Sequence, residues 1–386
     1  MPAAARKPSI VIRGVGLITP LGGNVETNWS ALLRGDFIAD HSRVGLPARP
    51  GSANDQDDVG RVSAAGLIAA REALAAASLT SSYQGAISTD RTALVVGTSR
   101  GPVDEWLDFP ELSRLHHGFG ISTLAARLAE GVGHGNGPRL TFCGACASGL
   151  HALIHAAMLI EHGDADRALV VASESSLHPV FLQSFRRLGV LAPKGFRCRP
   201  FDVSRNGLLV SEAAAAITLE RSEEPGKSAP GDIILDGRAF AGDAAHLTGF
   251  DPDGATIRRV LSEAIGGGPV DLIHAHGTGT VTNDAAEASA IDAALSDIAA
   301  AGERPSVYSH KGAIGHSLGA SGLISVVLNV MMHRRGVVPG NAGLESPLPL
   351  ARATLSRDAV SRTISRSIAC AAGFGGATAA VSLRTR

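Results

Sequence analysis

The stretch C-G-A-C-A-S-G-L-H-A-L-I-H-A-A-M-L-I-E-H, Cys143 to His162, decides the fold. From Ser148 onward it predicts a helix that is apolar nearly all round, and such a helix must be covered on every side. The segment Gly322–His333 has the same property. One such helix in each half of the chain predicts a helical layer between two sheets. With outer helices, we expect a five-layer αβαβα sandwich with two pseudo-symmetric halves.

The rest of the chain alternates apolar runs bounded by glycine with segments of helical period, which is typical of an α/β fold. A polar segment rich in proline and glycine, Arg221–Asp232, is the expected linker. We therefore expect one half over residues 1–222 and the other over residues 230–386. The predicted strands are Ser9–Ile12, Thr92–Gly97, Arg139–Phe142, Ala168–Ala172, Asp232–Asp236 and Val270–Ala275, and the predicted helices are Ser63–Ala77, Ile121–Glu130, Ala255–Ile265 and Asn283–Leu295.

Composition excludes several classes of function. The 386 residues have a formal net charge of −1, so no global field attracts nucleic acid or an anionic membrane. No apolar run reaches the roughly 18 residues that a membrane span needs. Four cysteines are too few for a disulfide framework in a chain of this length, so we expect a reducing, cytoplasmic setting.

Cys146 lies where a predicted strand turns into the first apolar helix. The free N–H groups and partial positive charge of a helix N-terminus favour a thiolate, and the same donors can hold an oxyanion on an acylated sulfur. This position predicts a nucleophile. A small buried hydrophobic residue is the alternative for Cys146, since most free cysteines are of that kind. For Cys143, which lies nearer the strand, that alternative is favoured.

Three glycine-rich motifs follow apolar strands in the second half. They are H-G-T-G-T (His276–Thr280), S-H-K-G-A-I-G-H-S-L-G-A-S-G (Ser309–Gly322) and G-F-G-G (Gly373–Gly376). Open α/β sheets collect ligand sites at the carboxyl ends of their strands. Asp284 and Glu287 begin the helix after the first motif, where a capping role is at least as well supported as chemistry.

Together these motifs resemble those of the β-ketoacyl-[acyl carrier protein] synthases of the elongating, Cys-His-His type, in the thiolase-like superfamily. They lie in the family's order along nearly the whole chain. The matching segments are G-V-G-L-I-T-P-L-G (Gly14–Gly22), A-C-A-S-G around Cys146, R-P-F-D-x-x-R-x-G (Arg199–Gly207), H-G-T-G-T, K-x-x-x-G-H-x-x-G-A-x-G and G-F-G-G.

The resemblance implies a thiolase-like fold and a decarboxylative Claisen condensation. Cys146 would accept an acyl group, and its N–H and that of Phe374 would form the oxyanion hole. His276 and His316 would be neutral hydrogen-bond donors to the malonyl thioester carbonyl and would stabilise the enolate left by carbon dioxide. The enolate carbon would then attack the acyl group on Cys146, giving a β-ketoacyl thioester.

Other site residues follow from the same resemblance. Lys311 would order the site electrostatically, and Phe374 would gate the acyl tunnel. Thr278 and Thr280 would hydrogen-bond the phosphopantetheine amides, although bonding within their own turn is an alternative.

The resemblance also implies partners. An acyl carrier protein brings the phosphopantetheine, so the chain needs no cofactor or metal of its own. Lys194, Arg197 and Arg199 are candidates for docking the acidic carrier, with a solvated charged loop as an equal alternative. A homodimer is expected, and a heterodimer is possible.

The sequence departs from the family pattern in several places. Ser325 stands where a glutamate usually partners the lysine, so Lys311 lacks its ion pair or takes another carboxylate such as Glu212. Asn206 replaces an aspartate, Ala377-Thr378 replaces Thr-Asn, and the stretch from Gly101 to Cys146 is short. These differences favour a specialised polyketide or unusual-lipid role over ordinary fatty-acid elongation.

Two other functions use the same residues. One is a non-condensing partner subunit of a heterodimer, and the other is an acyltransferase or thioester hydrolase using Cys146 with one histidine. Retaining the cysteine and both histidines favours condensation over each of them.

Overall fold

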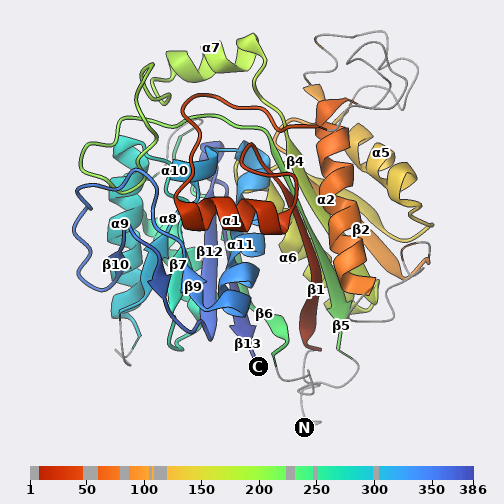
Figure 1. Cartoon of the computed structure of the whole chain (residues 1–386). Coiled ribbons are helices and arrows are strands. Elements are labelled where there is room, and N and C mark those ends of the chain that lie inside the picture. Colours follow the sequence, from red (N-terminus) through yellow and green to blue (C-terminus); the bar gives the residue numbers. More distant parts are fainter. Residues whose placement is uncertain are drawn as a thin grey trace.

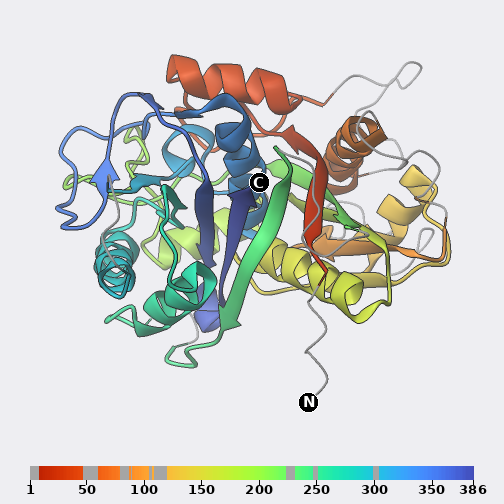
Figure 2. The ribbon, with the colours of Figure 1, turned by 90° about the horizontal axis from the view of Figure 1, so that it is seen from below.

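The structure is a computed structural model that describes residues 8–46, 60–78, 87, 89–103, 107, 120–222, 231–246, 251–298 and 304–386. Eleven of the described strands form one mixed sheet, and two short strands, Val337–Val338 and Val360–Ser361, pair separately. Helices pack against the large sheet (Figures 1 and 2). The stretch from Gly101 to Cys146, which the sequence analysis gave as short, lies partly outside the described residues.

The first half of the sheet has the order β3-β2-β4-β5-β1. β2 pairs in parallel with β3 and β4, whereas β5 pairs antiparallel with β4 and β1. These strands are β1 (Ile10–Ile18), β2 (Thr92–Gly97), β3 (Arg139–Phe142), β4 (Arg167–Glu174) and β5 (Ala213–Arg221).

The second half repeats this topology in the order β8-β7-β12-β13-β6. β7 pairs in parallel with β8 and β12, and β13 pairs antiparallel with β12 and β6. Val11 of β1 pairs with Ile234 of β6, which joins the halves into one sheet. The two pseudo-symmetric halves are therefore present. The strands are β6 (Ile233–Ala241), β7 (Leu272–His274), β8 (Ser306–Tyr308), β12 (Arg366–Ala372) and β13 (Thr378–Thr385).

Two helices, α6 (Ser148–His162) and α11 (Ser321–Arg335), form the middle layer. α6 packs on β2 and β4 of one half and on β13 of the other, while α11 packs on β12 and β5. The helices cross closely at two glycines, since a Cβ at Gly149 would lie 3.0 Å from the Leu323 Cβ, and one at Gly322 would lie 2.8 Å from the Leu150 Cγ. The two all-round apolar helices confirm the predicted central layer.

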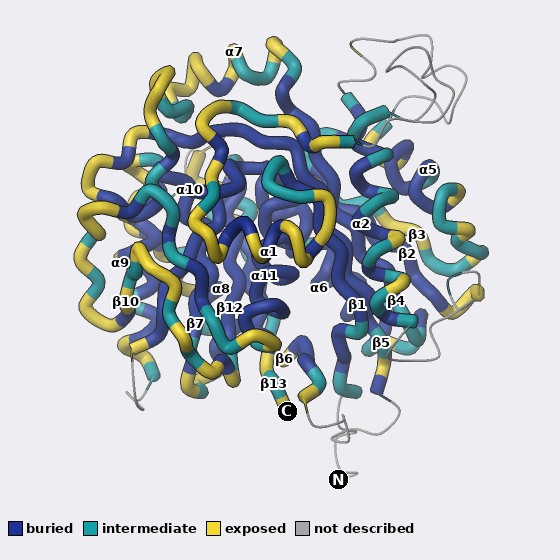
Figure 3. Tube along the Cα trace, in the orientation of Figure 1, coloured by how far each residue is buried: buried dark blue, intermediate teal, exposed yellow. Residues whose placement is uncertain are grey.

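The outer layers complete the sandwich. α2 (Arg61–Ser78) packs on β1, β5 and β4, and α8 (Ala255–Ile265) packs on β6 and β13. Figure 3 shows the buried residues gathered along the strands, with the exposed ones on outer elements such as α7. Remaining elements are α1 (Val25–Arg34), α5 (Thr123–Val132), α7 (Pro179–Arg187), α9 (Val281–Ser296), α10 (Lys311–Ile314), β9 (Val337–Val338), β10 (Thr354–Leu355) and β11 (Val360–Ser361).

β1 and β6 both run further than the sequence predicts, and glycine is the reason. A Cβ at Gly14 would lie 2.0 Å from the Ala73 carbonyl oxygen of α2, and one at Gly16 would lie 2.0 Å from that of Ala69. In β6, a Cβ at Gly237 would lie 2.3 Å from the Ala264 carbonyl oxygen of α8. These glycines allow a helix to approach a strand closely, and do not end the strand as the sequence suggested. The domain boundary between residues 222 and 230 stays a prediction.

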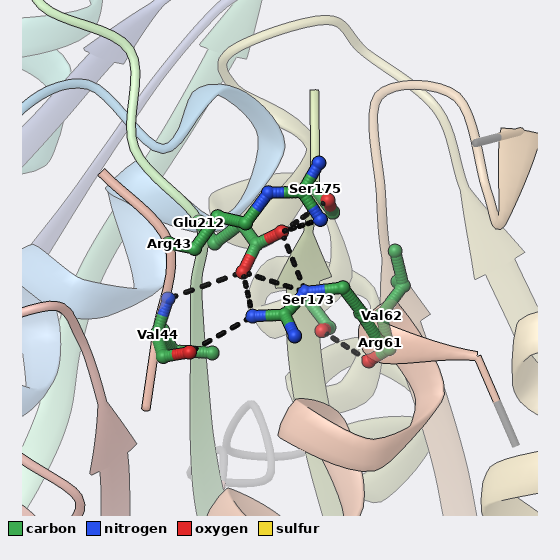
Figure 4. A network of polar contacts seen from close by, with 7 residues as sticks. All are labelled: Arg43, Val44, Arg61, Val62, Ser173, Ser175 and Glu212. Carbon is green, nitrogen blue, oxygen red and sulfur yellow. Dashed lines mark hydrogen bonds and ion pairs between the residues drawn. The ribbon is translucent and has the colours of Figure 1, made fainter. Parts of the chain in front are cut away.

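A buried carboxylate ties the start of α2 to the sheet (Figure 4). Glu212, whose side chain is 2% exposed, accepts hydrogen bonds from Arg61 Nη2 at 2.7 Å, Ser175 Oγ at 2.8 Å and the Val44 N–H at 3.1 Å. Arg43 lies 3.7 Å away. One side chain therefore joins the ends of β4 and β5 to α2 and to the loop before it.

We expect Glu212→Gln to lower the free energy of unfolding by about 2 kcal/mol, because buried hydrogen bonds to a charged acceptor are lost. Glu26→Gln is the matched control, since the Glu26 side chain is 64% exposed and pairs with Arg335 at 2.7 Å on the surface. The control should change stability by less than about 0.5 kcal/mol. Urea unfolding of both variants measures the difference, and equal effects would contradict the role given to Glu212.

Candidate active site

Cys146 lies in the turn between β3 and α6. Ala145, just before it, has a φ of +47°, a left-handed conformation that is costly for a residue with a side chain. The Ser148 hydroxyl holds the turn by accepting from the Gly144 N–H at 3.0 Å and donating to the Ala145 carbonyl at 2.6 Å. The sulfur is thereby fixed at the N-terminus of a buried helix, as predicted.

The surroundings of Cys146 are apolar. The side chain is 9% exposed and packs in a cluster with Leu177, Phe185, Val210 and Leu318. Burial raises the pKa of the Cys146 thiol to about 11, although the Lys311 charge opposes this. Desolvation therefore opposes the thiolate that the position at the helix N-terminus was predicted to favour.

The structure brings His276 and His316 together. Their ring centroids lie 5.3 Å apart at 78°, and both side chains are buried. The His316 N–H donates to the Leu209 carbonyl at 2.7 Å, and His316 forms a β-bridge with Val210, which packs in the Cys146 cluster. The Cys146 turn and the His316 loop therefore line the same region.

Both imidazoles are uncharged. Burial lowers the pKa of His276 and of His316 well below 6.5, and the neighbouring Lys311 charge acts in the same direction. Each Nδ1 atom is buried and has no hydrogen-bond partner among the residues that the structure describes. A ligand therefore cannot reach Nδ1 of either ring without displacing the residues that cover it.

Lys311 begins α10 and is 1% exposed, so it is not a surface lysine. Its Nζ donates to the His276 carbonyl, which links the two histidine loops. Burial lowers the pKa of Lys311 to about 8, and Glu287 is the largest influence opposing that shift. The suggested pairing with Glu212 is wrong, because Glu212 is occupied by Arg61 and Ser175.

Asp284 and Glu287 hold the H-G-T-G-T loop and do not cap their own helix. Glu287 accepts from the His276 N–H at 2.6 Å and the Gly277 N–H at 2.7 Å. Asp284 accepts from the N–H groups of Thr278 at 2.9 Å and Gly279 at 3.1 Å. Both carboxylates lie on α9 and bond backward to the preceding loop, so the capping interpretation is wrong.

The G-F-G-G turn reaches the Cys146 turn. A Cβ at Gly373 would lie 2.9 Å from the Gly144 carbonyl oxygen and 3.0 Å from the Cys146 nitrogen, so only glycine fits there. Phe374, next along, packs partly buried against the Cys146 cluster. The two segments predicted to share an oxyanion hole are thus in contact.

The two predicted pantetheine ligands bond to one another. The hydroxyls of Thr278 and Thr280 lie 2.9 Å apart, and that of Thr278 also lies 3.4 Å from Asp284 Oδ1. This is the turn bonding that the sequence left open for these two residues. Their contact with a ligand stays a prediction.

Cys143 is exposed, contrary to the expectation of a buried residue, and its thiol donates to the Ser99 carbonyl at 3.0 Å. Sequence reasoning also missed Arg205, which donates to the carbonyls of Thr280 at 3.2 Å, Val281 at 2.8 Å and Asp202 at 3.0 Å. Arg205 thus anchors the end of the histidine loop. The R-P-F-D-x-x-R-x-G motif was a signal for it, but the motif alone does not say what the arginine contacts.

Two features are absent from the described ranges. Within them, no helix is long and apolar enough to cross a membrane. In the same ranges, no group of three or more His, Cys, Asp or Glu side chains is arranged to hold a metal ion.

Comparison with known proteins identifies the class. Residues 37–225 match the family described as beta-ketoacyl synthase, N-terminal domain, and residues 233–345 match beta-ketoacyl synthase, C-terminal domain. The chain belongs to the β-ketoacyl synthase family. It is accordingly a transferase of the acyltransferase type, with the thiolase-like five-layer fold that its sequence predicted.

Individual relatives cover nearly the whole chain. A protein named polyketide beta-ketoacyl synthase 1, from Streptomyces halstedii, is 31% identical over 97% of this chain and 97% of its own length. The 3-oxoacyl-[acyl-carrier-protein] synthase 2 of Mycobacterium leprae is 29% identical over 87% of each chain. The solved AntDE:AntF complex, a ketosynthase with its acyl-carrier protein, is 22% identical, has a TM-score of 0.83 and covers 99% of this chain and 100% of its own. That last likeness concerns the fold alone.

Proposed function

We propose that the chain condenses an acyl group held on Cys146 with a malonyl thioester, releasing carbon dioxide and giving a β-ketoacyl thioester. One observation carries this proposal. Two buried, neutral histidines lie with ring centroids 5.3 Å apart, beside the apolar cluster that contains Cys146. Transfer of an acyl group alone needs one base, whereas an enolate oxygen is stabilised by two converging donors.

The first half-reaction loads the enzyme. The Cys146 sulfur attacks the acyl thioester carbonyl, the carrier thiol leaves with the cysteine proton, and an acyl-Cys146 thioester remains. The N–H groups of Cys146 and Phe374 bind the oxyanion of this step. The contact between Gly373 and the Cys146 backbone supports that assignment.

The second half-reaction extends the acyl group. The Nε2 atoms of His276 and His316 donate hydrogen bonds to the malonyl thioester carbonyl. The carboxylate leaves as carbon dioxide, and its bond electrons form the enolate. The enolate carbon attacks acyl-Cys146, the C–S bond breaks, and the Cys146 thiolate takes a proton. Lys311 adds a positive charge beside the histidine loops throughout, since its Nζ bonds to the His276 carbonyl.

An acyl carrier protein is the proposed source of both thioesters, with Thr278 and Thr280 binding the phosphopantetheine arm. Of the docking candidates, Arg199 pairs with Glu345 at 2.9 Å and Arg197 stacks at 3.5 Å from the Phe37 ring centroid, whereas Lys194 is exposed. A surface cavity of about 320 Å³ beside Arg197 is also lined by Arg34 and Arg357 and by the acidic residues Glu345 and Asp358, so its charge is mixed.

A dimer is the proposed assembly. β3 is an edge strand of the sheet, where Leu140 is 37% exposed. Nearby, Phe142 stacks on His155 at 4.0 Å, and Phe240 is 48% exposed. An open strand edge with apolar neighbours is a site for pairing with another chain.

Leu140→Glu is therefore expected to shift the protein from dimer to monomer, because it buries a charge at the pairing edge. Multi-angle light scattering measures the mass. Leu188→Glu, at a residue of similar exposure beyond α7, should stay dimeric. A monomeric wild type, or a dimeric Leu140→Glu, would refute this interface.

The proposed setting is the cytoplasm, and the proposed pathway is a specialised polyketide or unusual-lipid synthesis. All four cysteines are free, which suits a reducing compartment. The replacement of the usual glutamate by Ser325 sets the chain apart from ordinary elongating enzymes.

A steady-state assay with acyl carrier and malonyl carrier tests the proposal. It should give β-ketoacyl carrier and carbon dioxide in equal amounts. Free fatty acid without carbon dioxide would favour a hydrolase, and no turnover without a second subunit would favour the partner-subunit alternative.

A further inference from the structure

A chain of four buried polar side chains lies behind the proposed active site and takes no part in the chemistry described above. His274 Nδ1 lies 2.8 Å from Asn329 Oδ1, and His274 Nε2 lies 2.9 Å from His310 Nδ1. His310 Nε2 lies 3.2 Å from Ser321 Oγ. All four side chains are at most 1% exposed, so every one of these bonds is shielded from water.

The Asn329 end of this hydrogen-bonded chain fixes the direction of its first bond, and the other two directions follow when both rings are neutral. Asn329 Nδ2 donates to the Ile368 carbonyl at 3.3 Å, which can only accept, so Asn329 Oδ1 must be the acceptor toward His274. His274 therefore carries its proton on Nδ1 and accepts on Nε2. His310 in turn donates from Nδ1 and accepts on Nε2 from the Ser321 hydroxyl.

These directions belong to the state in which both rings are neutral. Burial lowers the pKa of His274 to about 3 and lowers that of His310 well below 6.5, with the Lys311 charge acting in the same direction on both. The hydrogen-bond geometry and the electrostatics therefore agree.

The four residues connect the segments that carry the proposed catalytic groups. His274 ends β7, two residues before His276, and His310 immediately precedes Lys311. Ser321 and Asn329 lie on α11, the rigid central helix. Both histidine loops are thus fixed to one buried helix by a single line of bonds.

This line of hydrogen-bonded side chains lies beside Ser325, the residue that replaces the usual glutamate. The Ser325 hydroxyl donates to the Ser321 carbonyl at 3.3 Å, so it offers Lys311 no charge. A hydrogen bond with the Ser325 backbone raises the pKa of His274, against the larger effect of burial. An uncharged hydrogen-bonded chain therefore lies beside the position at which Ser325 replaces the family's usual glutamate.

We propose that His274, His310 and Asn329 are positioning residues that hold His276 and Lys311 in register for decarboxylation, in place of the missing carboxylate. They act through the loops and touch no substrate. The kinetic part of this inference rests on the proposed function. Small displacements of catalytic groups can cost about 10²-fold in rate. Loss of these hydrogen bonds should therefore slow decarboxylation, the step that needs both histidine loops.

His274→Leu removes the hydrogen bonds to Asn329 and His310 and fills the space with an apolar side chain of similar size. We expect kcat for condensation to fall by about 10- to 100-fold, with the KM for acyl carrier and the rate of Cys146 acylation changed less than about twofold. His274→Gln, which can both donate and accept, should recover most of the loss. His134→Leu is the matched control, since His134 is a partly buried histidine bonded to the Thr92 carbonyl in the other half.

Nitrogen-15 NMR of histidine-labelled wild type gives a test that needs no activity. His274 and His310 should both appear as neutral Nδ1–H tautomers at pH 7. An Nε2–H or doubly protonated ring would overturn the inference, as would an unchanged kcat in folded His274→Leu or an equal loss in His134→Leu. A wild type with both expected tautomers and no condensation would instead contradict the proposed function alone.

Discussion

Cys146→Ala is expected to lower β-ketoacyl product formation by at least about 10³-fold, because no covalent acyl-enzyme can form. Mass spectrometry of the intact protein after incubation with acyl carrier should show no acyl adduct. The fold should survive, since the side chain removed is small and Ser148, not Cys146, holds the turn.

Cys143→Ala is the matched control for this variant. Cys143 lies three residues away, is exposed, and donates to the Ser99 carbonyl. It should keep its acyl adduct and its product rate within about twofold. An adduct retained in Cys146→Ala would mean that another residue is the nucleophile.

His316→Ala is expected to separate the two half-reactions. Acylation of Cys146 should proceed, because the oxyanion donors of that step lie on the Cys146 and Phe374 segments. Decarboxylation of malonyl carrier should fall by about 10²- to 10³-fold, the usual cost of one oxyanion donor. Carbon dioxide release from malonyl carrier measures this step alone.

His333→Ala is a suitable control for His316→Ala. His333 lies at the far end of α11 and bonds to Thr385 at 2.7 Å and Ser367 at 2.9 Å. It should decarboxylate normally. Normal decarboxylation in His316→Ala would remove His316 from the proposed mechanism.

Most of the architecture follows from features the sequence carries openly. The apolar helices Ser148–His162 and Gly322–His333 must be enclosed, and that requirement alone gives the central layer. The strand ends at Phe142 and His274 place glycine-rich motifs on one side of the sheet. These patterns depend on residues close together in the sequence, so they can be recognised without knowing the tertiary structure.

The errors come from effects that depend on distant neighbours. Glycines in β1 and β6 resembled turn residues, but each faces a helix that is far away in the sequence. The carboxylate near Lys311 is Glu287, on the preceding helix α9, and not Glu212, because burial and three donors hold Glu212 elsewhere. The raised pKa of Cys146 also depends on residues from other segments.

The most direct test of the account is a single-turnover chase of purified acyl-Cys146 enzyme with malonyl carrier. We predict that the acyl adduct leaves the enzyme as carbon dioxide is released, and that the carrier gains a β-ketoacyl group two carbons longer than the original acyl chain. Release of the acyl group as free acid, or its return to a carrier without extension, would contradict the assignment of His276 and His316.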